Sequence, residues 1–464
     1  MANIPSPGRE SFTSKFGVIA AAAGSAIGLG NIWRFPYVTG QNGGAAFLLI
    51  YLAFVTLVGI PVMMSELIIG RSAQKNAVGS FKKLAPRKPW FLVGMMGVAG
   101  AFVILAFYAV VAGWTLSYLF DSARYLVQPG KYGFAQMSTE QLRQYFQDGF
   151  DAFLVGTWKP ILTFLAMMGL TVIIVLSGVK EGIEKYAKIL MPALLVLLVA
   201  LVIRGITLEG ARAGVRFLFK PDFSQITGNT VLVAVGQAFF SLSVGMGTLI
   251  TYGSYIQKND NLANTAISVA FADTFIAVIA GLAIFPAVFA FGINPDSGQG
   301  LVYITLPVIF QKMALGSLWA LLFFILLCLA ALTSTISVLE VVVAYFKEEL
   351  NMNRKKATLL AGSSIGILGL IVSMSWGPLA GVTFGDKNIF GLFDASPAYF
   401  LPLGGFFIVV FVGWYWGREK SRKELSSEGR FSVSYYPFFI FLVRYFAPIA
   451  IALVFLNVVG LIRF

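Results

Sequence analysis

Long apolar runs are the feature that most constrains this chain. Many of them exceed the roughly 20 residues that an α-helix needs to cross a bilayer. Only 12% of the 464 residues are charged, whereas a soluble globular protein is about one quarter charged. Because lipid offers the backbone no hydrogen-bond partners, apolar runs in a bilayer have to form helices. The sequence therefore predicts an all-α polytopic membrane protein, with residues 1–464 forming a single domain in the lipid bilayer.

We expect about eleven transmembrane helices. The apolar runs that predict them lie near residues 14–38, 44–70, 89–120, 160–177, 189–205, 228–256, 261–291, 303–346, 357–375, 397–416 and 436–461. The eighth run is too long for one helix in the bilayer. It should contain a short helix near Leu301–Lys312 and a span that starts at Leu315.

The basic residues orient these helices. Lys and Arg gather in the loops near residues 71–88, 347–356 and 418–430, which fall on one side of the membrane if eleven spans alternate. The positive-inside rule makes that side cytoplasmic. We therefore expect a multi-pass protein of the cell membrane with a cytoplasmic N-terminus and an extracellular C-terminus. The net charge of +13 has the same origin and does not indicate a nucleic-acid partner.

Two spans are interrupted at mid-membrane by glycines among small polar residues. The first reads Gly24-Ser-Ala-Ile-Gly28-Leu-Gly30-Asn31, and the second reads Ser241-Leu-Ser243-Val-Gly245-Met-Gly247-Thr248. Glycine lets the backbone leave the helix, and irregular backbone at this depth survives only inside protein or beside a cavity. Matching interruptions in two halves of a membrane chain indicate a transporter's binding site. The alternative is close helix packing through small residues.

The interrupted spans are the first and the sixth, so two units of five helices run in opposite directions through the membrane. This spacing predicts a five-plus-five inverted repeat with broken helices 1 and 6. Repeat one should cover about residues 14–205 and repeat two about residues 228–416, with an extra helix at about 436–461.

Composition argues against an enzyme. The chain has no histidine, which excludes histidine acid–base catalysis, HExxH metalloprotease chemistry and histidine-ligated metals. Its one GxSxG string, at residues 362–366, falls inside an apolar run and not at the strand-to-helix elbow of a serine hydrolase. The single Cys328 cannot form an internal disulfide and is expected to pack in a helix.

Four motifs resemble the neurotransmitter:sodium symporter family. They are Gly24-Ser-Ala-Ile-Gly-Leu-Gly-Asn-Ile-Trp-Arg34-Phe-Pro-Tyr37, Gly182-Ile-Glu-Lys-Tyr-Ala-Lys-Ile-Leu-Met-Pro192, Gly236-Gln-Ala-Phe-Phe-Ser-Leu-Ser-Val-Gly-Met-Gly247 and Ala330-Ala-Leu-Thr-Ser334. The similarity extends over nearly the whole chain, and eleven spans are similar to many bacterial members. It implies a LeuT-type fold, symport by alternating access, two sodium ions and no organic cofactor.

The resemblance assigns two sodium sites. The first maps onto Ala26, Asn31, Ser241 and Asp273, and the second maps onto Gly24, Ile27, Ala330, Thr333 and Ser334. Carbonyls at a helix break together with hydroxyls and an amide suit a hard cation. Taken without the family, Thr333 and Ser334 are better explained by hydrogen bonds to a carbonyl one turn earlier.

Asp273 is expected near the membrane centre, where a carboxylate is costly and by default functional. The resemblance adds that family members often carry asparagine here and that animal members bind chloride nearby. A fixed charge on Asp273, with Ala277 one turn on, predicts transport without chloride. The alternative from the residue alone is a protonated structural aspartate.

The substrate class follows from the residues at the breaks. Gly28 stands where monoamine carriers place an aspartate, which leaves room for an amino acid's carboxylate near the amides of Leu29 and Gly30. The resemblance makes Tyr108 a hydrogen-bond partner of that carboxylate. The remaining residues implied for the amine and for an uncharged side-chain pocket are Ala26, Ile104, Phe240, Ser241, Ser243, Met246, Ser337 and Val338. We therefore expect hydrophobic L-amino acids as substrates.

The family's gates map onto charged and aromatic residues. Arg34 and Asp394 are expected to pair through water outside the site, above a lid of Phe240 and Tyr108. On the other side, the residues expected to close the path are Arg9, Glu348, Phe12, Tyr255 and Glu340. Glu66 should hold amides of the unwound span 6. Gly182 and Pro192 should let the cytoplasmic end of span 5 unwind.

Two other mechanisms stay open at this point. Asp273 and Glu66 could titrate, so a proton-coupled amino-acid transporter is the main alternative. A channel or sensor on the same fold is more remote, because no wide polar pore is visible in the sequence. The sequence leaves the oligomeric state undetermined.

Overall fold

The computed structural model describes residues 10–292 and 300–462. Within these residues the chain is almost wholly helical, and the two strands, Thr383–Phe384 and Lys387–Asn388, form one short antiparallel hairpin. The predicted fold class, an all-α membrane protein, is confirmed.

The helices follow one another in two halves. Those of the first half are α1 (Lys15–Ala26), α2 (Phe35–Gln41), α3 (Ala45–Phe54), α4 (Ile60–Ala73), α5 (Ala77–Leu84), α6 (Phe91–Val127), α7 (Pro129–Tyr132), α8 (Thr139–Val155), α9 (Trp158–Leu176), α10 (Lys185–Ile206) and α11 (Ala211–Phe219). Those of the second half are α12 (Gly228–Ser241), α13 (Thr248–Gly253), α14 (Leu262–Ala290), α15 (Leu306–Lys312), α16 (Gly316–Glu349), α17 (Arg354–Ser373), α18 (Ile389–Ala395), α19 (Pro397–Val410), α20 (Arg418–Leu425), α21 (Tyr436–Phe441) and α22 (Ala447–Val458). Turns of π-helix at Gly30–Arg34, Val55–Gly59, Val179–Glu184, Leu301–Thr305, Phe411–Trp416 and Leu442–Phe446 continue several of them, and short 3-10 turns lie at Phe134–Gln136 and Phe223–Gln225.

Eleven membrane spans can be traced through the described residues. Nine helices are long and apolar enough to cross a bilayer unaided, and Lys15–Ala26 with Gly30–Gln41 forms a tenth span that is bent by 52°. The sixth span consists of α12 and α13, which are each too short to cross and are separated by residues 242–247. The expected short helix before span 8 is present at Leu301–Lys312.

Two spans differ from their predicted limits. Span 5 begins at Val179 rather than near residue 189, because the charged segment at its start is helical and Lys188 pairs with Glu184 at 2.6 Å. Span 10 begins at Ile389 rather than near residue 397, where Asn388 caps α18 by accepting from the amide of Gly391. The second shift places Asp394 inside a helix.

The broken spans lie at the centre of the bundle. Helix α1 packs against α10, α14 and α16, and α13 packs against α4. The run from Ala20 to Ala26 in α1 is buried throughout and consists of small residues, which lets the neighbouring helices approach closely. Large apolar side chains of the outer helices, such as Ile173, Val196, Phe271 and Ile367, are exposed, as expected for a surface that faces lipid.

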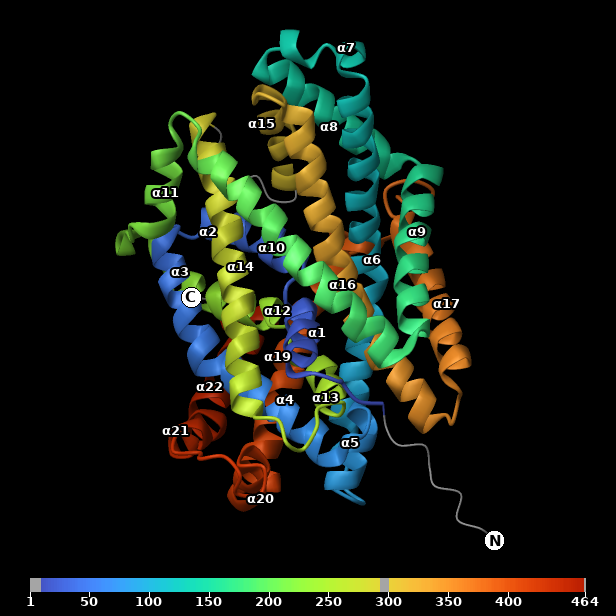
Figure 1. Ribbon diagram of the computed structural model, residues 1–464, viewed down its shortest axis with the longest axis vertical. Helices are drawn as coiled ribbons and strands as arrows, with labels where there is room; N and C mark the ends of the chain where they lie inside the picture. The colour runs from blue at the N-terminus through green and yellow to red at the C-terminus, as the bar shows by residue number, and fades with distance from the viewer. Residues whose placement is uncertain (1–9, 293–299, 463–464) are drawn as a thin grey trace.

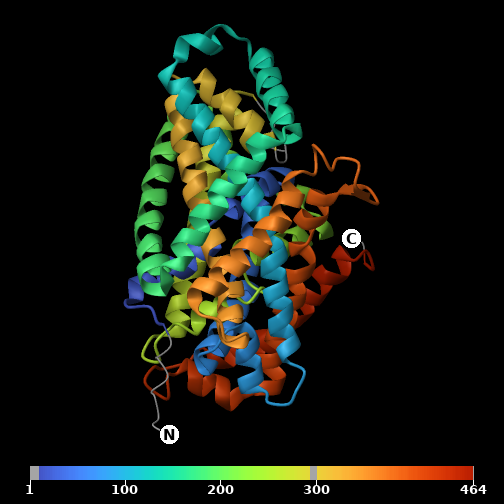
Figure 2. The ribbon, with the colours of Figure 1, turned by 90° about the vertical axis from the view of Figure 1, so that its right-hand side faces the viewer.

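The two ends of the molecule differ. Helices α5 and α20 lie at one end, and α7, α8 and α15 form a cap at the other end (Figures 1 and 2). We call the end that holds α5 and α20 the basic end. It contains the Lys- and Arg-rich loops around residues 71–88 and 418–430, and Lys347 of the third loop pairs there with Glu10.

Candidate functional site

The break in span 1 is short. Helix α1 ends at Ala26, Ile27 is extended (φ −74°, ψ 103°), and a π-helical turn resumes at Gly30. A Cβ on Gly28 would collide with Ser334 Oγ and would lie 2.6 Å from the hydroxyl oxygen of Tyr108. The glycine therefore permits close approach of two side chains from α6 and α16 to the bare backbone.

The break in span 6 is longer and contains three left-handed residues. Ser243, Gly245 and Gly247 have φ values of 51°, 95° and 77°. A Cβ on Gly245 would overlap the carbonyl of Leu401, and one on Gly404 would overlap the carbonyl of Gly245. The unwound backbone thus lies directly against α19. Glu66 fixes it from the other side, because its Oε1 accepts from the amide of Gly245 at 2.6 Å, as the sequence predicted.

A first cluster of polar groups joins spans 1, 6 and 7. Nδ2 of Asn31 donates to Asp273 Oδ1 at 2.7 Å and to Ser241 Oγ at 3.1 Å, and Ser241 Oγ donates to Asp273 Oδ2 at 2.8 Å. Oδ1 of Asn31 accepts from the amide of Gly28 at 3.0 Å. Tyr51 adds a longer contact, 3.4 Å from its hydroxyl to Asp273 Oδ2. All of these side chains are fully buried. Three of the four residues assigned to the first sodium site are therefore bonded to one another.

A second cluster of oxygens lies between span 1 and α16. Thr333 Oγ1 is 3.0 Å from the carbonyl of Ala330 and 3.4 Å from that of Ile27, and Ser334 Oγ is 3.5 Å from the carbonyl of Ser25. A Cβ on Gly24 would lie 3.3 Å from Cβ of Thr333. All residues assigned to the second sodium site are thus neighbours. Thr333 also makes the local bond to a carbonyl one turn earlier that the sequence left as its alternative.

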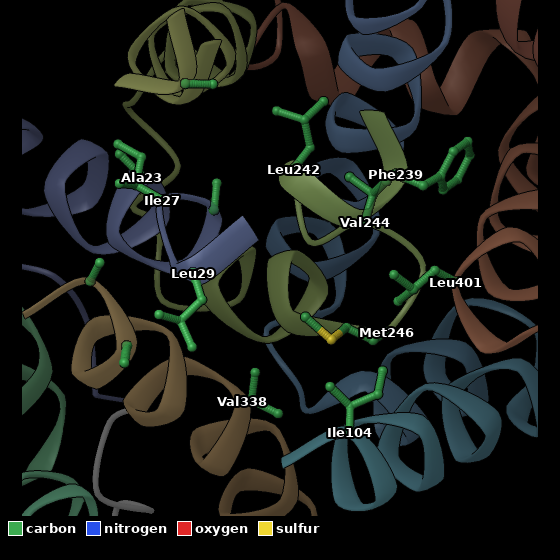
Figure 3. Packing of buried hydrophobic residues seen from close by; sticks show 14 of the residues in the cluster. Ala23, Ile27, Leu29, Ile104, Phe239, Leu242, Val244, Met246, Val338 and Leu401 are labelled. Atoms are coloured by element: carbon green, nitrogen blue, oxygen red, sulfur yellow. The ribbon is translucent and has the colours of Figure 1, made fainter. Parts of the chain in front are cut away.

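A small pocket of about 40 Å³ lies beside the unwound parts of spans 1 and 6. Its wall consists of Ala26, Gly28, Gly30, Ile104, Tyr108, Phe240, Ser243, Met246, Ser334, Val338, Pro397 and Leu401. Ile104, Met246, Val338 and Leu401 come from four different segments and surround one space (Figure 3). No residue of this wall carries a formal charge.

Three residues that the sequence assigned to the substrate lie beside this wall rather than in it. The amide of Leu29 donates to the hydroxyl of Tyr108 at 3.0 Å, and Ser241 belongs to the first cluster. Ser337 Oγ donates to the carbonyl of Ser334 at 2.8 Å.

A second cavity of about 240 Å³ lies on the far side of Phe240 and Tyr108, which line both spaces. The guanidinium of Arg34 lies 4.3 Å from the centre of the Phe240 ring. Asp394 also lines this cavity, and within the described part of the chain no ion pair joins it to Arg34. An aromatic layer one side chain thick therefore separates the pocket from the larger cavity.

The path toward the basic end is closed by several layers. The hydroxyl of Tyr255 donates to Glu340 Oε1 at 2.6 Å, and Arg354 pairs with Glu340 at 2.7 Å and with Glu10 at 3.0 Å. Phe12 packs edge-on against Tyr255, and its amide donates to the Tyr255 carbonyl at 3.1 Å. Burial raises the pKa of Glu10, but the nearby charges of Arg354 and Lys347 lower it by a larger amount, so the pKa of Glu10 lies below its ordinary value.

The predicted inner pair of Arg9 with Glu348 is only partly visible, since Arg9 lies outside the described residues. Glu348 Oε2 accepts from the amide and the side chain of Asn76, at 2.9 and 3.1 Å, and so binds the start of α5.

Gly182 and Pro192 lie in a span that is helical throughout in this structure. A Cβ on Gly182 would overlap the carbonyl of Ile174, so this glycine also lets α9 approach the start of span 5. Unwinding at this point stays a prediction.

Several site residues were missed from the sequence. Tyr51, Arg354, Glu10, Pro397 and Leu401 reach the site only through tertiary contacts. Glu184 was missed as well, although it is buried and accepts from Thr13 and Ser14 at the start of α1. An acidic residue inside a basic segment was the one signal that could have marked Glu184.

Comparisons with known proteins agree on one family. The model of the sodium:neurotransmitter symporter family matches residues 9–147 and 139–463. A Bacillus subtilis protein named "Uncharacterized sodium-dependent transporter YhdH" is 37% identical over 454 residues, which cover 98% of each chain. The human "Sodium- and chloride-dependent GABA transporter 2" is 28% identical over 463 residues, covering 89% of this chain and 74% of that protein.

A solved structure gives the same answer for the fold. The crystal structure of MhsT in complex with L-phenylalanine is 48% identical, with a TM-score of 0.86, and the match covers 97% of this chain and 100% of that one. These relatives carry transporter names, which agrees with the expectation that the chain is not an enzyme. The chain belongs to the sodium:neurotransmitter symporter family.

Proposed function

We propose that this protein is a sodium-coupled symporter that imports hydrophobic L-amino acids by alternating access. The observation that carries the proposal is the uncharged pocket that lies where spans 1 and 6 are both unwound, in a bundle that also holds two clusters of oxygens. The crystal complex of MhsT with L-phenylalanine, from a chain 48% identical, supports the same substrate class.

The unwound backbone offers partners for the polar ends of an amino acid. The amide of Gly30, the hydroxyl of Tyr108 and the amide of Leu29, which donates to that hydroxyl in this structure, can bind its carboxylate. Carbonyls and hydroxyls near Ala26 and Ser243 can accept from its ammonium group. An aspartate at residue 28, as in monoamine carriers, would collide with Ser334, so this position offers no fixed carboxylate and leaves that charge to the substrate.

Two sodium ions would occupy the two clusters. At the first, Asn31 now directs its amide nitrogen toward Asp273 and Ser241. Sodium needs oxygen ligands, so binding there requires the amide to turn its oxygen toward the ion. The residues assigned to the first sodium site and to the substrate overlap at Ala26 and Ser241, so the two ligands would lie next to each other. Each should then increase the affinity of the protein for the other.

Chloride independence is the finer part of the proposal. Asp273 supplies a fixed carboxylate, and Ala277, fully buried one turn on, offers no hydroxyl to an anion. Asp273→Asn should then weaken sodium-dependent binding, and added chloride should not restore it.

The proposed setting is the cell membrane, with the basic end in the cytoplasm. The larger cavity beyond Phe240 would then face outward, and the layers around Tyr255 and Arg354 would close the inner path. Labelling of an introduced cysteine in α8 from outside intact cells would test this orientation.

The deciding experiment measures binding of radiolabelled L-phenylalanine to purified protein. Sodium is exchanged for potassium, chloride for gluconate, and the pH is varied from 5.5 to 8.5. We expect binding that needs sodium and is unchanged in gluconate. Binding in potassium that increases at acid pH would favour proton coupling, and loss of binding in gluconate would refute chloride independence. Counterflow in liposomes separates transport from a channel or a sensor.

A further inference from the structure

An apolar groove on the outside of the bundle lies at the basic end. Pro89, Trp90, Leu92, Val93, Met96 and Phe407 line it, and its volume is about 400 Å³. The Leu92 side chain is 54% exposed, so the groove belongs to the outer surface. The site described above uses none of these residues.

The groove is lined by residues of two neighbouring spans, α6 and span 10. Trp90 lies 5.1 Å from the Phe411 ring and 5.4 Å from the Tyr415 ring, near the end of span 10. Met96 and Phe407 lie further along the same two spans. At 1.5 Å per residue, Trp90 to Met96 covers about 9 Å of α6. The groove therefore extends from the aromatic residues of the membrane interface toward the bilayer interior.

Positive charge gathers at the outer end of the groove. Arg87 and Lys88 immediately precede it, and Arg418 follows Tyr415 by three residues; all three are exposed. Their neighbours are already engaged, because Lys82 pairs with Glu349 and Lys83 donates to the carbonyl of Ala73. Across the described residues no carboxylate pairs with Arg87, Lys88 or Arg418. Three cations without partners beside an apolar groove favour an anionic amphiphile.

We propose that this groove binds an anionic phospholipid. One acyl chain lies between α6 and span 10, and the phosphate is held by Arg87, Lys88 and Arg418 with Trp90 at the interface. Basic residues near a membrane surface attract anionic lipids, each by about 1 kcal/mol or about fivefold in affinity. The lipid surface supplies the ligand, so the site needs no soluble partner.

The test uses the full chain purified in detergent and native mass spectrometry. Dioleoyl phosphatidylglycerol or dioleoyl phosphatidylcholine is added, and the lipid retained on the protein is counted. We expect a several-fold preference for phosphatidylglycerol. The double variant Arg87→Gln/Lys88→Gln should lower phosphatidylglycerol retention at least tenfold. The matched control Lys355→Gln/Lys356→Gln removes the same charge from the first turn of α17 and should leave retention unchanged.

A second pair of variants tests the acyl groove. Met96→Trp should fill it and reduce retention of both lipids, whereas Met96→Leu should not. Equal retention of the two lipids by the unaltered protein, or equal losses in the two charge variants, would overturn the proposal. A dimer that Met96→Trp abolishes would show that a second copy of the chain covers the groove, and would overturn it as well.

Discussion

At the scale of single residues, the site depends on side chains that are absent as much as on those present. Gly28 brings Tyr108 and Ser334 against bare backbone, and Gly245 brings Leu401 against the unwound segment of span 6. Both glycines stand where any Cβ would meet another atom at less than contact distance. Their role is therefore steric, in addition to the conformational freedom that Gly245 needs at positive φ.

Gly28→Ala should consequently weaken substrate binding strongly without unfolding the protein. The added methyl group would displace Ser334 and Tyr108 from the pocket, and we expect at least a tenfold loss of L-phenylalanine affinity in the sodium-dependent binding assay. Gly169→Ala in α9 is the matched control, because a Cβ there meets nothing within 4 Å. Unchanged affinity in Gly28→Ala would contradict the assigned position of the substrate.

At the scale of elements, two unwound or weakly wound segments are fixed by buried carboxylates. Glu66 binds the amide of Gly245 in span 6. Glu184 accepts from the amide of Thr13 at 2.8 Å, from the hydroxyl of Thr13 at 2.7 Å and from Ser14 Oγ at 3.1 Å. The first contact stabilises the site, and the second joins the start of α1 to the start of span 5.

Removing Glu66 should destabilise span 6 in a graded way. Glu66→Gln keeps an acceptor for the Gly245 amide, but Glu66→Ala leaves that buried donor without one, at a cost of roughly 1–3 kcal/mol. We expect the thermal unfolding temperature to be highest for the unaltered protein, lower for Glu66→Gln and lowest for Glu66→Ala. The exposed Glu419→Ala serves as the control, and an Ala variant at position 66 as stable as the unaltered protein would exclude the role.

Glu184→Ala should loosen the basic end of span 1. Three hydrogen bonds to Thr13 and Ser14 and the pair with Lys188 are lost together. Hydrogen exchange followed by mass spectrometry should show faster exchange in residues 14–24 and 179–190. Glu181→Ala is the matched control, since Glu181 is exposed and pairs only loosely with Lys180, at 3.8 Å. Equal exchange rates in the two variants would argue against a role of Glu184 in holding the start of span 1 to the start of span 5.

At the scale of the whole molecule, charged groups tie the basic end together from distant parts of the chain. Arg71 of α4 is fully buried and pairs with Glu424 of α20 at 2.6 Å, and Lys258 pairs with the same carboxylate at 3.1 Å. Arg71 also donates to the carbonyl of Asp260. This cluster joins span 2, the loop after α13 and the helix after span 10 (Figure 1).

This cluster should make stability depend on pH. Burial raises the pKa of Glu424, but Arg71 and Lys258 lower it by more, so the folded pKa lies below the ordinary value of 4.5. A carboxyl with a lowered folded pKa stabilises the fold fully above its unfolded pKa and loses that contribution as the pH falls through the folded pKa. Thermal unfolding should therefore be insensitive to this group from pH 7 to 5 and weaken below about pH 4. At pH 7 the Glu424→Gln variant should unfold at a lower temperature than the unaltered protein, and its stability should decrease less on going to acid pH. Equal unfolding temperatures of the two proteins at pH 7 would contradict this role of Glu424.

The sequence alone determined the membrane class, the number of spans and the position of both helix breaks. These properties are local, because about 20 apolar residues require a spanning helix and glycines at mid-membrane require protein or a cavity around them. The resemblance to the family, carried by motifs that are each continuous along the chain, also supplied the residues assigned to the two sodium sites. Only the tertiary structure decided which groups complete the site, since Asn31 and Asp273 are 242 residues apart. Tyr51, Arg354, Pro397 and Leu401 carry no local signal, and each acts only through the helix that packs against its own.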